Sequence, residues 1–338
     1  IMNEKIIIFK NDKIGDLIHA YNAIQNIINN NLDKQIIIFL SHYNSEMKFL
    51  FLKKNVKFHI ITEKTNFFDK LKILYFFMIT NIKKTYIFKP SYFLFLLPLF
   101  FYFKKIKFYG ICVNNLNYYR PSLFLRKFLE RFVVNDRETK KIRKSINDLH
   151  MNLTLNENKT NYNLASFKKK ELGELKKEYY LIHFNKYKFS TLDWHLNDFF
   201  KIIEELENKK YKIFITNDIN DEDTNSSIKK ILVNKNLKNI THFPNIKGEN
   251  FFNLIGNAKL VISFHGMITS IAAVQNTKVL DLFNCDIKSK KDFYRYKNAF
   301  HEFKPKLNNY EFIIPKRNLD MSIKKIKNII NNGRKINY

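Results

Sequence analysis

The sequence predicts an α/β protein with two Rossmann-like domains, each built on a doubly wound parallel sheet, that face each other across a cleft. Short apolar runs alternate with amphipathic stretches, which is typical of strands and helices in a parallel sheet. This alternation occurs twice and lapses at residues 156–177, where the chain is polar and charged. The 338 residues are enough for two domains of ordinary size.

The first half opens with a strand, a polar turn and a helix. Residues 6–9 are apolar, residues 11–15 form the turn, and a helix begins at Asp16. Apolar residues of this helix recur with the 3.6-residue period of one helical face. They are Leu17, Ala20, Tyr21, Ile24, Ile27 and Ile28. Further strands are predicted at residues 35–40, 56–61, 85–88 and 106–109, with helical stretches between them.

The second half repeats this pattern. Strands are predicted at residues 180–184, 212–216, 239–243, 260–263 and 279–283, and helices at 193–206, 223–232 and 249–255. Between the last two strands, His265-Gly266 precedes a helix rich in small residues. Ligands of open parallel sheets bind at the carboxyl ends of strands, where a helix N-terminus suits a phosphate. We therefore expect a bound nucleotide near His265.

The pattern divides the chain into an N-terminal domain (1–155), a linker (156–177), a C-terminal domain (178–318) and a final helix (319–338). A hydrophobic fraction of 45% and an aromatic fraction of 16% exclude wholesale disorder. Two cysteines, Cys112 and Cys285, make neither a disulfide framework nor a metal cluster, which favours a reducing compartment.

The net charge of +28 attracts nucleic acid, anionic lipid or phosphorylated substrates by the same long-range physics. Lysines are spread through both halves rather than gathered on one face, so a nucleic-acid partner is not expected. No secretory signal is recognised. The longest apolar run, residues 92–103, contains Pro98 and is shorter than the roughly 20 residues of a membrane-spanning helix. With Lys89, Lys104 and Lys105 at its ends, it is either a buried helix or a segment that lies on a membrane surface.

Polar residues follow several predicted strands. Asp16 is either a helix cap, the commoner use of aspartate, or a general base at the rim of a cleft. His19, one turn later, could orient Asp16 or contact substrate, although a lone histidine on a helix is more often structural. In the second half, Lys186 and Lys188 suit a phosphate as point charges, or belong to an exposed basic loop.

Two further strand ends add polar groups in the second half. Thr216-Asn217-Asp218 ends one strand, where a carboxylate can accept hydrogen bonds from a ribose, and His265-Gly266 ends another. The sequence contains neither GxxxxGK(S/T) nor GxGxxG, which argues against an ATPase or a dehydrogenase. It also has no His/Cys cluster with metal-ligand spacing, so a mechanism without a metal cofactor is expected.

Three segments, which span most of the chain in order, resemble the heptosyltransferases of glycosyltransferase family 9. They are IIIFKNDKIGDLIHAYNAI, LIHFNKYKFSTLDWHLNDFFKIIEEL and FPNIKGENFFNLIGNAKLVISFHGMITSIAAV. The resemblance implies the GT-B fold, with the acceptor bound by the first half and a nucleotide-sugar, such as ADP-heptose, by the second. It implies inverting transfer without a metal and makes Asp16 the catalytic base. It assigns acceptor binding or support to Lys13, Gly15 and His19. The positions it implies for donor binding are Lys186, Lys188, Thr216, Asn217, Asp218, Ile246, His265, Gly266, Met267 and Thr269.

Several positions depart from the family pattern. Phe264 stands where the family has aspartate, Thr269 where it has histidine, and Leu192 where it has lysine. These departures leave open a donor such as a UDP- or GDP-hexose, used for capsule or glycoprotein. They also leave open a non-catalytic relative that binds a glycan. The resemblance implies a lipid-linked or core oligosaccharide acceptor, and a cytoplasmic enzyme peripheral to the inner face of the cytoplasmic membrane.

Overall fold

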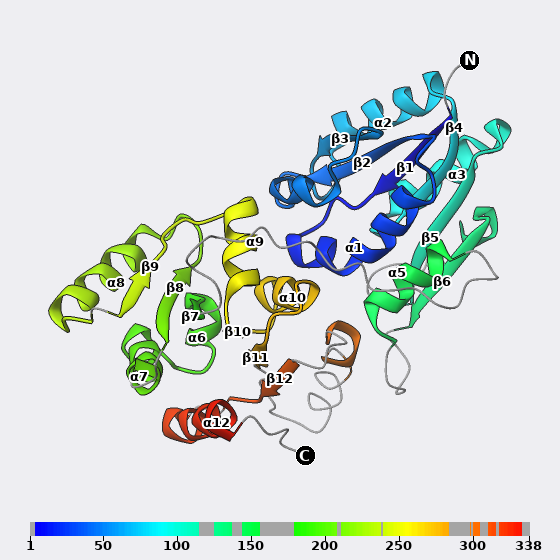
Figure 1. Ribbon diagram of the computed structural model, residues 1–338. Coiled ribbons are helices and arrows are strands. Elements are labelled where there is room, and N and C mark those ends of the chain that lie inside the picture. Colours follow the sequence, from blue (N-terminus) through cyan, green and yellow to red (C-terminus); the bar gives the residue numbers. More distant parts are fainter. Residues whose placement is uncertain are drawn as a thin grey trace. The chain divides into compact units, whose positions relative to one another are not determined.

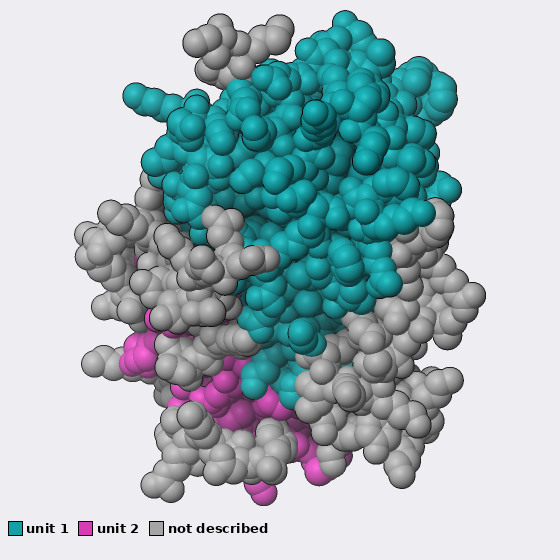
Figure 2. Space-filling model, turned by 90° about the vertical axis from the view of Figure 1, so that its right-hand side faces the viewer, with its two compact units in different colours: residues 1–165, 294–304 teal, residues 166–293, 305–338 magenta. Residues whose placement is uncertain are grey.

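The computed structural model describes residues 4–114, 125–136, 144–155, 179–207, 211–237, 239–283, 298, 300–304, 310–315 and 318–332. The chain divides into two compact units (Figure 2). Unit 1 comprises Ile1–Ala165 and Tyr294–Lys304, and unit 2 comprises Ser166–Phe293 and Pro305–Tyr338. Each unit contains one six-stranded sheet whose paired strands are all parallel. The predicted fold of two doubly wound α/β domains is confirmed. The predicted linker, residues 156–177, lies outside the described residues.

Unit 1 has the strand order β3-β2-β1-β4-β5-β6. Its strands are β1 (Lys5–Phe9), β2 (Gln35–Ser41), β3 (Val56–Ile61), β4 (Ile82–Ile87), β5 (Lys107–Asn114) and β6 (Arg131–Asp136). Its helices are α1 (Ile14–Asn29), α2 (Phe67–Ile79), α3 (Tyr92–Phe100) and α5 (Ile146–Thr154). Short 3₁₀ turns are η1 (Ser45–Phe51), η2 (Tyr102–Lys104) and η3 (Arg126–Phe128).

Helices cover both faces of this sheet, because β1 and β2 are apolar along nearly their whole length and must be buried on both sides. Figure 1 shows α1 and α2 on opposite faces. One core joins Phe9 and Phe39 of the sheet to Phe77 of α2 and Leu94 of α3. Right-handed crossovers explain this layout, because the chain runs outward through β2 and β3 and then returns over the other face to β4.

Unit 2 has the strand order β12-β11-β10-β7-β8-β9. Its strands are β7 (Tyr179–Phe184), β8 (Lys212–Asn217), β9 (Ile240–His242), β10 (Leu260–Phe264), β11 (Val279–Leu282) and β12 (Tyr310–Ile313). Its helices are α6 (Lys186–Ser190), α7 (Leu196–Glu207), α8 (Glu222–Asn234), α9 (Gly248–Asn257), α10 (Met267–Val274) and α12 (Leu319–Asn332). The final helix belongs to this unit, where Ile326 is part of the core and Lys327 pairs with Glu205 of α7.

Most of the predicted strands are present to within a few residues. The sequence did not reveal β6 or β12, and it did not reveal the short helix α6. Residues 92–103 form α3 and η2, which bury Leu94, Phe95 and Leu97 but leave other apolar side chains exposed. Within the described residues, no helix is long and apolar enough to cross a membrane.

Candidate functional site

Each sheet has one topological switch point, where the chain leaves neighbouring strands in opposite directions. In unit 1 it lies between β1 and β4, and in unit 2 between β10 and β7. Ligands of open α/β sheets bind outside the carboxyl ends of the strands at such points. The segments that follow β1, β4, β7 and β10 are therefore the first places to look for a site.

In unit 1, the turn from β1 to α1 is fixed by the end of β2. The Asn44 amide donates to the Lys10 carbonyl at 2.8 Å, and the Ser41 hydroxyl donates to the Asp12 carbonyl at 2.6 Å. From the end of β4, the Lys89 ammonium donates to the Asn11 carbonyl at 3.1 Å. These bonds give the turn one conformation and so set where α1 begins.

The turn after β1 brings together three charged side chains, Lys10, Asp12 and Lys89, that the sequence analysis did not single out as a group. The Lys10 ammonium lies 2.6 Å from a carboxylate oxygen of Asp12, and both side chains are buried. Burial raises the pKa of Asp12 to about 6; Lys10 opposes the shift and the nearby Asp16 carboxylate adds to it. Burial also lowers the pKa of Lys89, and the nearby Asp12 carboxylate opposes this shift. The available signal was a charged residue directly after an apolar strand, at Lys10 and again at Lys89.

Asp16 lies in the first turn of α1 and is partly exposed. It is not the N-cap, because Lys13 holds that position without a side-chain capping bond and Gly15 precedes Asp16 inside the helix. Among the described residues, no hydrogen bond or ion pair to the Asp16 carboxylate is formed. A carboxylate that bonds to none of the described residues and lies next to a switch point is suited to accept a proton from a ligand.

His19 is held by the structure of unit 1. Its Nδ1 lies 3.1 Å from the Asn147 side-chain oxygen, and its ring packs 5.6 Å from the ring of Phe303. Its carbonyl accepts a hydrogen bond from His150 Nδ1 of α5 at 3.1 Å. These contacts favour a structural role for His19 in joining α1 to α5.

In unit 2, the turn after β7 presents two lysines. Asn185 caps α6, accepting from the Lys188 backbone N–H at 2.8 Å, and its amide donates to Asp218 at 2.9 Å. Lys186 is exposed, whereas Lys188 is partly buried and its ammonium donates to the His265 carbonyl after β10. Burial lowers the pKa of Lys188, and the carboxylates of Asp281 and Asp218 oppose that shift.

Gly266 is the N-cap of α10, with φ of 156° and ψ of −146°, a conformation that side chains disfavour. A Cβ at this position would lie 3.0 Å from the Lys188 ammonium. The fully buried Thr269 donates to the Gly266 carbonyl at 2.9 Å and receives the Gly266 N–H at 3.1 Å. Thr269 therefore shapes the start of α10, and the glycine lets an ammonium approach the backbone closely.

His265 is oriented by a fully buried carboxylate. Its Nδ1 lies 2.6 Å from an Asp281 oxygen, which also accepts the Tyr310 hydroxyl hydrogen bond. Burial raises the pKa of Tyr310, which keeps its hydroxyl protonated as the donor. The imidazole packs against the Phe283 ring at 5.0 Å. Since Nδ1 is occupied by Asp281, Nε2 is the atom left for a ligand. No described residue bonds to that atom.

The strand end at β8 is a closed polar network. The Thr216 hydroxyl lies 3.0 Å from His183 Nδ1, and the Asn217 side-chain oxygen lies 2.8 Å from His242 Nε2. Thr216 and Asn217 are buried, whereas the side chain of Asp218 is 41% exposed. Of these three residues predicted to bind the donor, Asp218 is the one whose side chain a ligand can reach.

The remaining predicted positions differ in exposure. Ile246, between β9 and α9, and Met267, the first residue of α10, are both partly exposed. Phe264 and Leu192 are buried in the core of unit 2, and the Phe264 ring lies 4.9 Å from the ring of Phe189. These two departures from the family pattern therefore fill the core with apolar groups. Within the described part of the chain, no group of His, Cys, Asp and Glu side chains could hold a metal ion.

Comparison with solved structures assigns the fold to the GT-B class. Heptosyltransferase II of E. coli, described as an ADP-heptose enzyme, aligns with a TM-score of 0.68 at 12% identity, covering 97% of this chain and 98% of that one. A second E. coli heptosyltransferase, solved with ADP-2-deoxy-2-fluoro heptose, aligns with a TM-score of 0.64 at 11% identity, over 98% and 100% of the two chains. The predicted resemblance to heptosyltransferases is confirmed at the level of the fold.

The same fold also occurs in another kind of enzyme. UDP-GlcNAc 2-epimerase from Methanocaldococcus jannaschii aligns with a TM-score of 0.57 at 13% identity, covering 99% of this chain and 94% of that one. No protein-family model and no curated protein matches the sequence. The chemistry must therefore be argued from the residues at the two switch points, because one fold hosts several activities.

Proposed function

We propose that the chain is an inverting, metal-independent glycosyltransferase that moves a heptose-like sugar from a nucleotide-sugar donor to a surface glycan such as the lipopolysaccharide core. The observation that carries this proposal is the polar chemistry at both switch points. Unit 1 offers the Asp16 carboxylate, to which no described residue bonds, and unit 2 offers Lys188, His265 and Gly266 at adjacent strand ends. The likeness in fold to a heptosyltransferase solved with an ADP-heptose analogue supports it.

The unit 2 residues suit a diphosphate. The Lys188 ammonium supplies a positive charge beside the N-terminus of α10, where the helix dipole also favours an anion. When protonated, His265 donates from Nε2 while Asp281 stabilises the imidazolium through Nδ1. These groups stabilise the negative charge that develops on the leaving diphosphate, which is the role a metal ion plays in other enzymes.

The unit 1 residue supplies the base. Asp16 takes the proton of the acceptor hydroxyl, the acceptor oxygen bonds to the anomeric carbon, and the bond from that carbon to the diphosphate breaks with its electron pair. A single displacement of this kind inverts the configuration at the anomeric carbon. Lys13 is the N-cap of α1, Gly15 lies next to Asp16 in the first turn, and the charges of Asp12 and Lys89 lie close to the Asp16 carboxylate.

The sugar nucleotide is the part of the proposal with a specific alternative. Phe264, Leu192 and Thr269 stand where the resembling family has donor contacts, and here all three are buried. A UDP- or GDP-hexose is therefore the second candidate donor, with Lys188 and His265 taking over the phosphate contacts. As part of the proposal, the reaction occurs in the cytoplasm at the inner face of the membrane, on a lipid-linked or core oligosaccharide.

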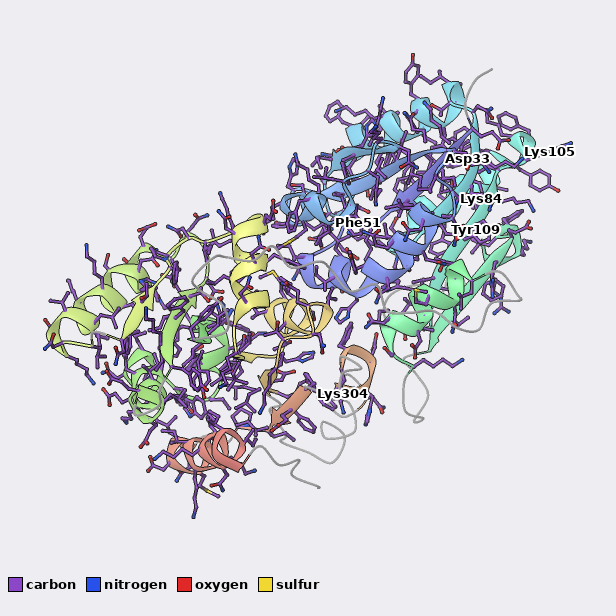
Figure 3. All side chains as sticks on the ribbon, viewed as in Figure 1. Asp33, Phe51, Lys84, Lys105, Tyr109 and Lys304 are labelled. Carbon is purple, nitrogen blue, oxygen red and sulfur yellow. The ribbon has the colours of Figure 1, made fainter. Side chains whose placement is uncertain are left out.

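The test is a transfer assay in which ADP-heptose, UDP-hexoses and GDP-hexoses are each offered with a core oligosaccharide. Acceptor-dependent release of a nucleoside diphosphate is measured for the wild type, Asp16→Asn and Asp33→Asn. Asp33 is an exposed carboxylate on unit 1 (Figure 3). It lies in the loop before β2, at the amino ends of the strands, whereas Asp16 follows the carboxyl end of β1. It is therefore the matched control.

One donor should support transfer, and Asp16→Asn should lower kcat by about 10²- to 10⁴-fold, the usual contribution of a general base. The same variant should bind the nucleoside diphosphate as tightly as the wild type, and Asp33→Asn should transfer normally. Undiminished transfer by Asp16→Asn would remove Asp16 from the mechanism. Conversion of a UDP-sugar without any acceptor would instead indicate an epimerase.

A further inference from the structure

Unit 1 has an apolar surface on the outer side of α2. This helix buries Ile73 and Phe77 against the sheet, yet its other side exposes large apolar groups. We call these residues the α2 surface: Phe67, Phe68, Leu71, Tyr75, Met78 and Ile79, with exposed fractions of 48 to 70%. Single exposed apolar residues are common, but six on one 13-residue helix need an explanation.

The end of α3 and η2 extend this surface. Leu99, Phe100, Tyr102 and Phe103 are exposed, and Tyr102 reaches 76%. The two segments are neighbours, because the Phe77 and Phe101 rings lie 5.3 Å apart and the Lys104 ammonium donates to the Phe77 carbonyl at 2.7 Å. The exposed aromatic side chains of η2 therefore stand beside the C-terminal turn of α2.

The segments that form this surface are rich in lysine. From residue 64 to residue 107 the chain holds nine lysines and one carboxylate, Asp69. Asp69 is buried and binds the Thr62 backbone N–H at 2.8 Å, so it does not neutralise the outside. Lys64, Lys72 and Lys105 are exposed and have no ion-pair partner among the described residues; Figure 3 shows Lys105 at the margin of unit 1.

We propose that the α2 surface and the neighbouring η2 residues dock on an anionic lipid bilayer. Aromatic and aliphatic side chains enter the boundary between headgroups and acyl chains, while lysines pair with lipid phosphates, as in interfacial helices. The exposed lysines beside the α2 surface argue against a second copy of this chain as the occupant, because the same lysines on the second copy would repel them. The inference depends on unit 1 alone and holds whether or not the chain transfers a sugar.

The experiment is vesicle co-flotation of the full chain, without nucleotide, at several salt concentrations. Vesicles of phosphatidylcholine are compared with vesicles of phosphatidylcholine and phosphatidylglycerol in a 7:3 ratio. The apolar variant is Phe68→Ser with Phe103→Ser. Its matched control is Leu32→Ser with Val233→Ser, since those side chains are 66% and 71% exposed but lie outside this surface. The charge variant is Lys72→Glu with Lys105→Glu.

The wild type should bind the anionic vesicles at least tenfold more tightly than the neutral ones, and added salt should weaken that binding. The apolar variant should lose at least tenfold in affinity, the control should bind like the wild type, and the charge variant should lose its preference for anionic lipid. Absence of wild-type binding to either vesicle would overturn the proposal. So would a dimer in sedimentation that Phe68→Ser with Phe103→Ser dissociates while vesicle binding stays unchanged.

Discussion

The contact between His265 and Asp281 gives the most quantitative prediction. Replacing Asp281 with Ala removes a fully buried carboxylate whose one oxygen accepts hydrogen bonds from both His265 and Tyr310. A hydrogen bond to a charged group contributes about 1.5–3 kcal/mol to stability. Asp281→Ala should therefore lower the free energy of unfolding by about 3–6 kcal/mol, and Tyr310→Phe by about half of that.

A double-mutant cycle isolates the contact with His265. At a separation of 2.6 Å, the coupling free energy between His265→Ala and Asp281→Ala should be about 1.5–3 kcal/mol. Trp194, the single tryptophan, is buried in unit 2, so its fluorescence during urea unfolding reports on that unit. Additive effects, within about 0.5 kcal/mol, would mean that the two side chains do not interact and would refute the argument for an oriented imidazole.

Three further predictions concern the pH dependence of stability and two glycines. The pKa of Asp12 is raised from 3.8 to about 6, so the folded state holds this proton more tightly and stability falls as pH rises from 4 to 6. In urea titrations over that range, wild type should lose about 2–3 kcal/mol relative to Asp12→Asn, and parallel curves would contradict this. Gly266→Ala should weaken nucleoside diphosphate binding at least tenfold in calorimetry, because the new methyl group meets the Lys188 ammonium. Unchanged affinity would mean that the close approach of Lys188 to Gly266 is not part of the binding site. Gly256→Ala should destabilise unit 2 by about 1–3 kcal/mol, since the new Cβ would lie 1.9 Å from the Gln275 side-chain oxygen. Helix propensity alone predicts the opposite, a gain in stability of about 1 kcal/mol.

The sequence predicts the two sheets well because buried parallel strands are nearly continuous apolar runs, as in β1 and β10. It predicts β12 poorly because Tyr310–Ile313 is only four residues long and contains a glutamate. It also places Lys188 and His265 at strand ends, and the structure brings them together because β7 and β10 are neighbours.

Contacts that depend on strand order could not be predicted in the same way. The meeting of His265, Asp281 and Tyr310 requires that β10, β11 and β12 lie side by side, which local patterns do not encode. A visible signal was Asp281 inside an apolar strand, because a buried carboxylate needs partners. Thr269 shows the opposite case: its matching position suggested a donor contact, whereas its hydroxyl bonds to the Gly266 backbone.

The central claim, that unit 2 binds a nucleoside diphosphate at the ends of β7 and β10, is tested most directly by melting temperature. ADP, UDP and GDP are each added to the wild type and to Lys188→Ala, with unfolding followed by Trp194 fluorescence. One nucleotide should raise the melting temperature of the wild type, since a ligand at 100 times its Kd stabilises the folded state by about 2.7 kcal/mol. Lys188→Ala should lose most of that shift. No shift with any of the three nucleotides, or an undiminished shift in Lys188→Ala, would contradict the claim.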